Sequence, residues 1–457
     1  MGEKALTQNK MGTAPIFKLI MTMSLPAIFS MTVQALYNVF DSIFVGNLEG
    51  IKGSAALEAL SLAFPLQMLL VAVGVGTGVG INSLISRRLG EKNFKEANDT
   101  ATHGLLLSLL SWVVFLILGL TIVEPFFKMY NPSQQVLEYG IQYTKIVMVF
   151  SIFSFVQITV EKTLQATGDM IFPMLFQLTG AVTNIILDPL LIYGIGPFPK
   201  LEVVGAAVAT VAGQALAMIF AVVVLFVKKH RIKVSFKNFK LSKITIKNIY
   251  SVGFPSIIMQ SIGSVMILGL NAILTAYSGA VAVLGVYYKL QSFIFMPVFG
   301  LNQGLMPIIG YNYGARNKKR VYGALKYGVL IAAVIMTVGV ILFWTIPDKL
   351  LGLFGEGNAI LIDVGVNAFR IISLCFIPAA AGIMFTTLFQ ATGKGLRSLF
   401  MSFLRQLVLI LPIAFLLFNY VGQKYVWFAF PIAEIGALTV AILFFLNLVK
   451  GDFKKLG

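Results

Sequence analysis

Residues 16–45 set the fold class of this chain, and they read IFKLIMTMSLPAIFSMTVQALYNVFDSIFV. The run is almost entirely apolar. A helix rises about 1.5 Å per residue, so this segment is long enough to cross the ~30 Å hydrocarbon core of a bilayer. We therefore predict a transmembrane helix here, with a bend at Pro26.

Four polar side chains interrupt the second half of this helix. Gln34, Tyr37, Asn38 and Asp41 are spaced i, i+3, i+4, i+7, so they share one helix face. An ionisable group is costly to place among lipid tails, and such a group normally faces the bundle interior or a wet cavity. Asp41 is therefore a candidate functional acid.

Long apolar runs recur along the whole chain. Of its 457 residues 58% are hydrophobic and only 12% charged, a balance that would leave a water-soluble protein with far too much exposed apolar surface. We predict an all-α polytopic membrane protein with twelve transmembrane helices. The twelve runs are Ile16–Val45, Leu57–Ile85, Ala97–Val123, Glu138–Val160, Ile171–Gly194, Val203–Val227, Ile249–Tyr277, Val281–Ile309, Val321–Ile346, Leu361–Leu388, Leu399–Phe418 and Val426–Val449.

The net charge of +17 is distributed as a membrane protein requires. Alternate loops carry 26 of the 35 Lys and Arg residues, whereas the loops on the other side carry five. We therefore expect a multi-pass protein of the cell (plasma) membrane. By the positive-inside rule, both of its termini lie in the cytoplasm. We expect the basic loops to contact anionic lipid headgroups, and we expect no nucleic-acid partner.

The two halves of the chain correspond to each other. Gln-Ala-Thr-Gly at 165–168 recurs at 390–393, an offset of 225, and nearly the same offset relates Leu25-Pro26 to Phe254-Pro255 and Gly90 to Gly314. Six helices return a chain to its starting side, so the two copies have parallel topology. We predict two pseudo-symmetric six-helix lobes, at 1–227 and 248–457, joined by a basic cytoplasmic linker at 228–247.

A second acid lies at the same predicted depth as Asp41. Asp188 is 20 residues into the fifth span, counted from Gly168, and Asn184 lies one turn below it on the same face. Pro189 removes a helix hydrogen bond, and carbonyls left without a donor are tolerated only where they line a cavity. We expect Asp41 and Asp188 to share one chamber in the N-terminal lobe.

An alternative is that basic residues within the spans neutralise these acids, which would then be structural. Lys145 and Arg370 are near span ends, where a long side chain can reach the interface. The sequence leaves open which way Lys289, Arg405 and Glu434 point. Glu161, at the end of the fourth span, is expected to be solvated or to cap a helix.

Signals for an enzyme are weak. The glycine-rich segment Gly74–Gly80 lies mid-span, without a preceding strand or a following Lys-Ser/Thr, so close helix packing explains it better than a phosphate loop. The chain has two histidines and one cysteine, with no metal-ligand spacing. We predict neither enzymatic activity nor a cofactor.

In the second lobe, Met259, Gln260 and Met296 suit a pocket for lipophilic cations.

These features together resemble the multidrug and toxic compound extrusion (MATE) family over nearly the whole chain. The motifs that carry the resemblance are Pro26 with Gln34-x-x-Tyr37-x-x-x-Asp41, Asn184-x-x-x-Asp188, Gly205-Ala206-Ala207-x-Ala209-Thr210, the paired Gln-Ala-Thr-Gly loops, and Tyr311–Arg316. The resemblance implies an antiporter that expels organic cations as protons or sodium ions enter. It places cation-linked acids at Asp41 and Asp188, supported by Gln34, Tyr37, Asn184 and Thr210.

One departure from the family pattern bears on the site. Some members carry acids on helices of the second lobe, whereas the seventh span here offers only Gln260 and Asn271. We therefore place coupling in the N-terminal lobe. The ion stays open, because paired carboxylates can bind a proton or coordinate sodium; we favour the proton.

The sequence thus favours a monomeric, cation-coupled exporter of lipophilic organic cations. The alternative is a flippase for lipid-linked saccharides, whose family shares this architecture. A flippase would need basic residues for the pyrophosphate, and Lys145, Lys289, Arg370 and Arg405 would then face the substrate.

Overall fold

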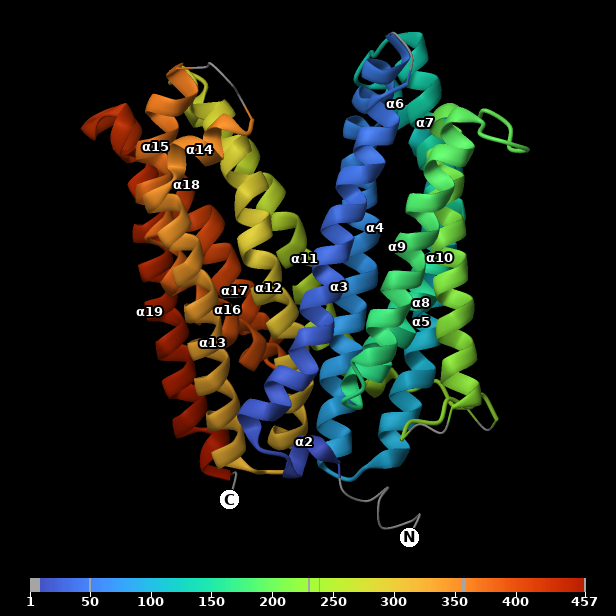
Figure 1. Cartoon of the computed structure of the whole chain (residues 1–457). Coiled ribbons are helices and arrows are strands. Elements are labelled where there is room, and N and C mark those ends of the chain that lie inside the picture. Colours follow the sequence, from blue (N-terminus) through green and yellow to red (C-terminus); the bar gives the residue numbers. More distant parts are fainter. Residues whose placement is uncertain (1–8, 49–50, 229–230, 238, 355–358, 456–457) are drawn as a thin grey trace. The chain divides into compact units, whose positions relative to one another are not determined.

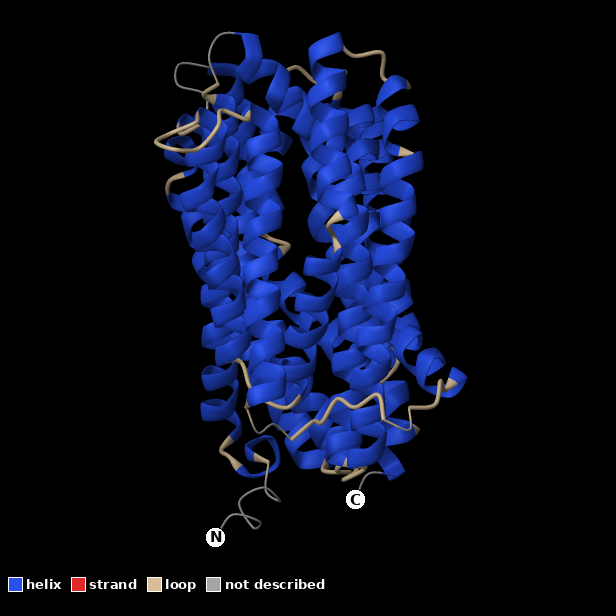
Figure 2. Cartoon of the chain, turned by 90° about the vertical axis from the view of Figure 1, so that its right-hand side faces the viewer, coloured by secondary structure: helices blue, strands red, loops and turns tan. Residues whose placement is uncertain are grey.

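Helices form all the regular secondary structure of the described residues in this computed structural model (Figures 1 and 2). The structure describes residues 9–48, 51–228, 231–237, 239–354 and 359–455, apart from the side chains of residues 38, 39, 42, 51 and 455. The helices are α2 (Lys10–Thr13), α3 (Ile16–Gly46), α4 (Ile51–Gly90), α5 (Phe94–Thr121), α6 (Val123–Lys128), α7 (Gln134–Val149), α8 (Ile152–Ala166), α9 (Ile171–Tyr193), α10 (Glu202–Val227), α11 (Lys243–Leu274), α12 (Ala280–Gly314), α13 (Lys318–Thr345), α14 (Pro347–Gly352), α15 (Ala359–Ser373), α16 (Phe376–Ala391), α17 (Gly395–Phe403), η1 (Leu404–Ile410), α18 (Leu411–Leu416), η2 (Leu417–Val421), η3 (Gln423–Phe428), α19 (Ala429–Lys450) and η4 (Asp452–Lys455).

The prediction of twelve membrane spans is confirmed. Ten spans among the described residues are long and apolar enough to cross a bilayer, and two bent helix pairs complete the set. The pairs are α7 with α8, bent by 46°, and α15 with α16, bent by 47°. They are the fourth and tenth predicted spans, and the residues that precede α8 and α16, Ser151 and Cys375, are 224 positions apart. The bend is therefore a property of the repeat, which hydropathy alone did not reveal.

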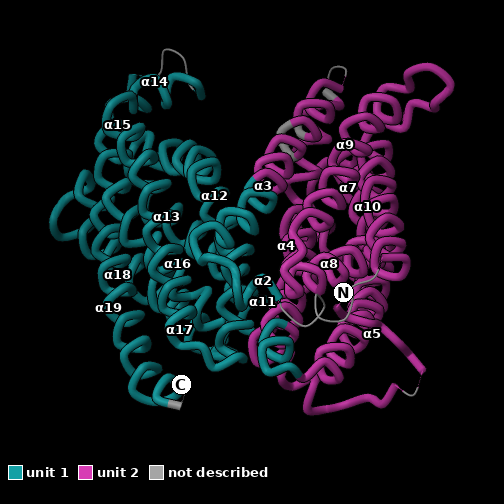
Figure 3. Tube along the Cα trace, turned by 60° about the horizontal axis from the view of Figure 1, so that its bottom comes forward, with its two compact units in different colours: residues 1–28, 86–92, 254–457 teal, residues 29–85, 93–253 magenta. Residues whose placement is uncertain are grey.

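Contacts divide the chain into two compact units (Figure 3). Unit 1 comprises residues 1–28, 86–92 and 254–457, and unit 2 comprises residues 29–85 and 93–253. The first part of α3 thus belongs with the second half of the sequence, and the first part of α11 belongs with the first half. Pro26 and Pro255, matched by the repeat, lie within two residues of these two points of division. The predicted boundaries at 227 and 248 remain a prediction.

Glycines bring helix backbones together within unit 2. A Cβ atom on Gly74 would lie 3.1 Å from Ile158 Cδ1, and one on Gly78 would lie 2.6 Å from Lys162 Cγ, both on α8. A Cβ atom on Gly80 would overlap the carbonyl oxygen of Ile249 in α11. The predicted role of this glycine-rich segment in close packing is confirmed, as is common where helices associate in lipid.

The repeat-related glycines Gly90 and Gly314 pack closely within unit 1. A Cβ atom on Gly90 would overlap the carbonyl oxygen of Tyr311, and one on Gly314 would overlap the carbonyl oxygen of Arg87. The last turns of α4 and α12 therefore pack backbone to backbone. In the same unit α12 packs on the start of α3, where a Cβ atom on Gly304 would lie 2.8 Å from the Ser24 nitrogen.

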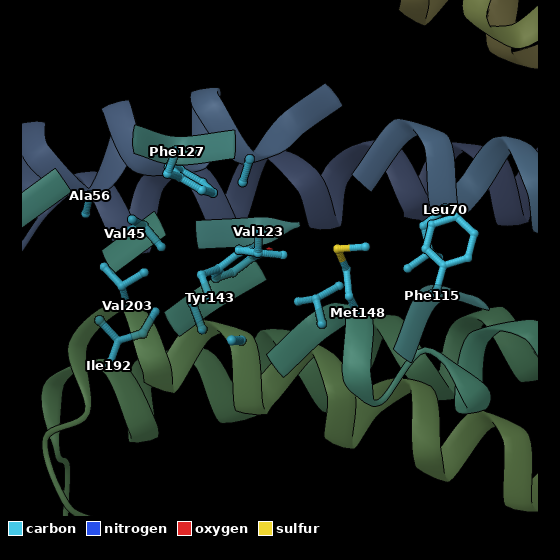
Figure 4. Close-up of a cluster of buried hydrophobic side chains, with 14 of the residues drawn as sticks. Val45, Ala56, Leu70, Phe115, Val123, Phe127, Tyr143, Met148, Ile192 and Val203 are labelled. Carbon is cyan, nitrogen blue, oxygen red and sulfur yellow. The ribbon is translucent and has the colours of Figure 1, made fainter. Parts of the chain in front are cut away.

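The core of unit 2 is a cluster of apolar side chains to which every helix from α3 to α10 contributes (Figure 4). Phe115, Phe127, Met148 and Ile192 are all at most 3% exposed. Lipid tails are as apolar as these side chains, so the cluster stabilises the unit through close van der Waals contact rather than through removal from water. This packed core fixes the helices that carry the polar residues described below.

We predict that Gly90→Ala destabilises the protein by about 1–3 kcal/mol, because the added methyl group has no space beside the Tyr311 carbonyl. Thermal unfolding of the purified protein in detergent measures the change. Gly285→Ala, in α12 and with open space around its Cβ position, is the matched control. Equal melting temperatures for the two variants would show that the close contact has no energetic role.

Candidate functional site

The candidate site is built on α9 and α10, which approach each other closely in unit 2. A Cβ atom on Gly213 of α10 would lie 2.6 Å from the Gly180 carbonyl oxygen of α9. Asn184 lies one turn beyond Gly180 along α9 and is 2% exposed, and Asp188 lies two turns beyond it and is 0% exposed. The short distance between the helices brings Thr210 of α10, 8% exposed, beside Asn184.

Hydrogen bonds join these three predicted residues. The Asn184 amide is assigned from its partners: Nδ2 donates to Asp188 Oδ2 at 3.0 Å, and Oδ1 accepts from the Thr210 backbone nitrogen at 3.2 Å and from Thr210 Oγ1 at 3.3 Å. The amide therefore links the acid on α9 to α10 and holds the Asp188 carboxyl group in place. Asn184, Asp188 and Thr210 thus lie together, as the family resemblance implies, while their role in coupling stays a prediction.

Helix α3 adds Tyr37 and Asp41 to the same site. The Tyr37 hydroxyl group is hydrogen-bonded to the Thr210 side chain, and the carboxyl groups of Asp41 and Asp188 are within hydrogen-bonding reach of each other. A continuous polar connection thus runs from Tyr37 through Thr210, Asn184 and Asp188 to Asp41. Asp41 Oδ1 is buried without a hydrogen-bond partner among the described residues. The site can accept one more donor or a cation there.

Sequence reasoning missed two members of the site. Tyr143 of α7 is 3% exposed, hydrogen-bonds to Gln67 of α4, and lies within electrostatic range of Tyr37, Asp41 and Asp188. A single tyrosine in an apolar span is usually a packing residue, so nothing in the sequence around Tyr143 marked it as part of a site. The one signal for a polar site here was Gln67, an amide in the middle of the second predicted span.

The other predicted binding residues stay predictions. Gln34 is exposed, and the side chain of Asn38 lies outside the described residues. Met259, Gln260 and Met296 belong to unit 1, where Gln260 is exposed and the two methionines are half-buried.

The two acids of the site have no basic counter-ion among the described residues. Lys145 lies 3.8 Å from Glu124 of α6, and Arg405 lies 3.4 Å from Glu434. A hydrogen bond from Lys128 lowers the pKa of the Glu124 carboxyl group, so Lys145 faces an acid that stays ionised. The alternative in which lysine or arginine neutralises Asp41 and Asp188 therefore finds no support in the structure.

Oxygen atoms are the only ligands that this site could offer a bound ion. The described residues contain no group of three or more His, Cys, Asp or Glu side chains suited to a metal. Two carboxyl groups, the Asn184 amide oxygen and the Thr210 hydroxyl group are ligands for a hard monovalent cation, and the carboxyl groups alone suffice for a proton.

The expectation for Glu161 is wrong. Glu161 and Lys162 of α8 are 3% and 6% exposed and form an ion pair at 3.0 Å. Gln165 and Gln157 also hydrogen-bond to Glu161, at 3.0 and 2.9 Å. Gly78 of α4 explains the burial, because the absence of a side chain there lets α8 pack against α4 along the Lys162 stem.

We predict that Glu161→Gln destabilises the protein by about 3–5 kcal/mol, because it removes the charged partner of a buried lysine. Glu161→Gln/Lys162→Met should recover most of that loss. Glu124→Gln, which removes an exposed acid, is the control for the charge change. Thermal unfolding in detergent separates the three variants, and a stable Glu161→Gln protein would contradict a structural role for the pair.

The sequence of this chain is similar to those of known proteins over nearly its whole length. The MatE family model matches two segments of the chain, residues 26–190 and 253–416, one in each half of the predicted repeat. The chain is similar to "Multidrug export protein MepA" of Staphylococcus haemolyticus, with 28% identity over 420 residues, 92% of this chain and 91% of that protein. It is 27% identical to "Multidrug export protein MepA" of Staphylococcus aureus over 431 residues, 94% of this chain and 93% of that protein.

Solved structures give the same picture. The fold is similar to that of a multidrug resistance MATE family transporter of the MOP superfamily described as outward-facing, with a TM-score of 0.90, 28% identity and 99% of both chains covered. A MOP superfamily transporter from Pyrococcus furiosus, described as having a binding pocket of reverse polarity, matches with a TM-score of 0.90 and 27% identity over 97% of this chain and 98% of that one.

Proposed function

Because this chain belongs to the MatE family of multidrug transporters, we propose that it is a secondary active exporter that antiports lipophilic organic cations against protons. Small-molecule substrates and a membrane setting follow from its relatives and from its many apolar helices. The cationic nature of the substrates and the identity of the coupling ion are the parts that we propose.

The contact between Asp41 and Asp188 carries this proposal. Two ionised carboxylates repel each other, whereas one proton placed between them makes a hydrogen bond. The pair is therefore a chemically simple site for one exchangeable proton. A sodium ion could also use these oxygens; we favour the proton because the two carboxyl groups alone suffice to hold it.

Competition for the acids explains how proton entry could drive drug release. An ionised carboxylate attracts an organic cation, and a protonated one does not. Proton binding at Asp41 and Asp188 would therefore weaken the hold on a bound cation, and deprotonation would restore it. Tyr37 and Tyr143 add aromatic faces near the acids, which suit a lipophilic cation.

Helix α3 is the element through which proton binding would act on the rest of the protein. Asp41 lies in the part of α3 that belongs to unit 2, and residues 16–28 of the same helix belong to unit 1. Pro26, which cannot donate a helix hydrogen bond, lies beside the point of division. A change in hydrogen bonding at Asp41 would thus alter the bend of α3 and favour either the drug-holding or the drug-releasing state.

The exporter is favoured over a flippase for lipid-linked saccharides. A flippase would need basic side chains for pyrophosphate, yet Lys145 and Arg405 already have acidic partners.

We further propose that the protein is a monomer without cofactor or catalytic activity, and that it lies in the cell membrane with both termini in the cytoplasm.

We predict that Asp41→Asn and Asp188→Asn each reduce ethidium efflux from whole cells to near the level of cells without the transporter. An amide has nearly the shape of the carboxyl group but cannot exchange a proton. Asp363→Asn, which changes an exposed acid on α15, is the matched control and should transport normally. Unchanged efflux by both acid variants at equal expression would remove the basis of the proposal.

We predict that a pH gradient drives substrate uptake into proteoliposomes and that a sodium gradient at constant pH does not. The carboxyl pair would bind a proton directly, so transport should respond to proton concentration in sodium-free buffer. Fluorescence of accumulated ethidium is the measurement, with Asp41→Asn proteoliposomes as the background. Transport driven by sodium alone would overturn the choice of ion while leaving the acid pair as the site.

A further inference from the structure

Unit 1 contains a cavity at the place where α4 and α12 end. It has a volume of about 380 Å³ and is lined by two short segments, residues 90–92 after α4 and residues 314–316 after α12. The two segments are 224 positions apart, so they are equivalent in the internal repeat. The same three positions from each half of the chain therefore form this cavity.

Backbone atoms of the two segments approach each other closely beside this cavity. A Cβ atom on Gly90 would lie 2.8 Å from the Ala315 nitrogen and 2.9 Å from the Tyr311 carbonyl carbon. The missing side chain at Gly90 therefore brings residues 90–92 against residues 314–316. The two basic side chains that line the cavity, Lys92 and Arg316, come one from each segment.

Lys92 and Arg316 have backbone conformations that residues with a side chain rarely adopt. Their φ angles are 60° and 56°, in the left-handed region, where a helix end usually has glycine because a Cβ atom is unfavourable there. Four residues other than glycine have positive φ in the described part of the chain, and two of them are this repeat-related pair. The chain thus keeps basic side chains at two positions where glycine would be more stable. Strain retained in this way points to a function of the side chains.

The charges of these two residues are not balanced by neighbouring acids. Neither Lys92 nor Arg316 has an ion pair or a side-chain hydrogen bond within the described part of the chain. Glu91 is the one acid that lines the cavity, and it is already bonded to Arg88 at 2.6 Å. Arg87 lies within electrostatic range of both Arg88 and Glu91 and adds further positive charge. The cavity therefore favours an anion.

We propose that this cavity binds the phosphate group of an anionic ligand, with Lys92 on one side and Arg316 on the other. The oxygens of a phosphate group face in several directions, so one group can contact both cations. The Arg316 guanidinium group can donate two parallel hydrogen bonds to phosphate oxygens, and the Lys92 ammonium group supplies a second positive charge. The volume is within the range of small-molecule sites and leaves space for a substituent on the phosphate. A free anion and a lipid headgroup both offer this chemistry.

A bound phosphate group would fasten the end of α4 to the end of α12. Residues 86–92 belong to unit 1, whereas residues 51–85 of the same helix belong to unit 2, so the ligand would hold the last turn of α4 in unit 1. This inference goes beyond the proposed function, because binding here requires neither the acid pair nor transport. Asp41→Asn would abolish export without changing phosphate binding, so failure of either proposal can be recognised separately.

Thermal unfolding of the purified full-length protein tests the proposal with two ligands. The first is inorganic phosphate in neutral detergent, titrated against chloride at constant ionic strength so that general charge screening stays the same. The second is phosphatidylglycerol, added in increasing fractions to phosphatidylcholine nanodiscs. Lys92→Gln/Arg316→Gln removes both cations of the cavity. Lys237→Gln/Lys240→Gln removes two exposed cations of the basic linker and is the matched control.

A ligand that binds only the folded protein raises its melting temperature. Inorganic phosphate should raise the melting temperature of the unmodified protein if the ligand is a free anion, and phosphatidylglycerol alone should do so if the ligand is a lipid headgroup. In either case Lys92→Gln/Arg316→Gln should need at least about tenfold more ligand for the same rise, because two charged contacts are lost. The control variant should need less than about twofold more.

Two further variants separate a loss of binding from a loss of structure. Lys92→Gly/Arg316→Gly suits the left-handed backbone, so without ligand it should melt at least as high as the unmodified protein, yet it should not respond to either ligand. Lys92→Arg/Arg316→Lys exchanges the two cations and should keep the response. The proposal would be overturned if neither ligand stabilised the unmodified protein, or if the control variant lost as much of the response as Lys92→Gln/Arg316→Gln.

Discussion

Ionisable side chains are costly in a helix bundle surrounded by lipid, and this protein satisfies that constraint in three different ways. Glu161 and Lys162 are buried and neutralise each other, and two glutamines hydrogen-bond to Glu161. Arg405 and Glu434 form a looser pair with donors to spare. Asp41 and Asp188 have each other and no base among the described residues. A pair of acids without a base needs a mobile positive charge, and this need connects the architecture to transport.

Close helix packing is what makes these pairings geometrically possible. Gly180 and Gly213 bring α9 and α10 together, so that Asn184 reaches both Thr210 and Asp188. Gly78 gives the Lys162 stem its place against α4. Association of helices in lipid depends on such contacts, because there is little hydrophobic driving force between them. The glycines therefore support the polar sites directly as well as the fold.

The internal repeat organises both the fold and its departures from regular helix. The bends that split the fourth and tenth spans measure 46° and 47°, and both halves have a proline where a helix passes between the two units. The chemistry, however, is not repeated. One half carries the acid pair on α3 and α9, and the other carries an arginine–glutamate pair on η1 and α19. The two copies thus share a scaffold and differ in the charges that they place inside it.

The sequence alone determined the all-helical class, the twelve spans, the repeat and most of the acid site, because hydropathy and helical spacing are local properties of the chain. Asn184-x-x-x-Asp188 is one such spacing: it predicted that the two residues share one helix face, and in the structure their side chains form a hydrogen bond. Tyr143 and Gln67, the burial of Glu161, and the pairing of Arg405 with Glu434 were decided by tertiary structure. Each of these depends on which faces of distant helices meet, and a helix of uniformly apolar residues has no periodicity that would reveal the face it turns toward a neighbour.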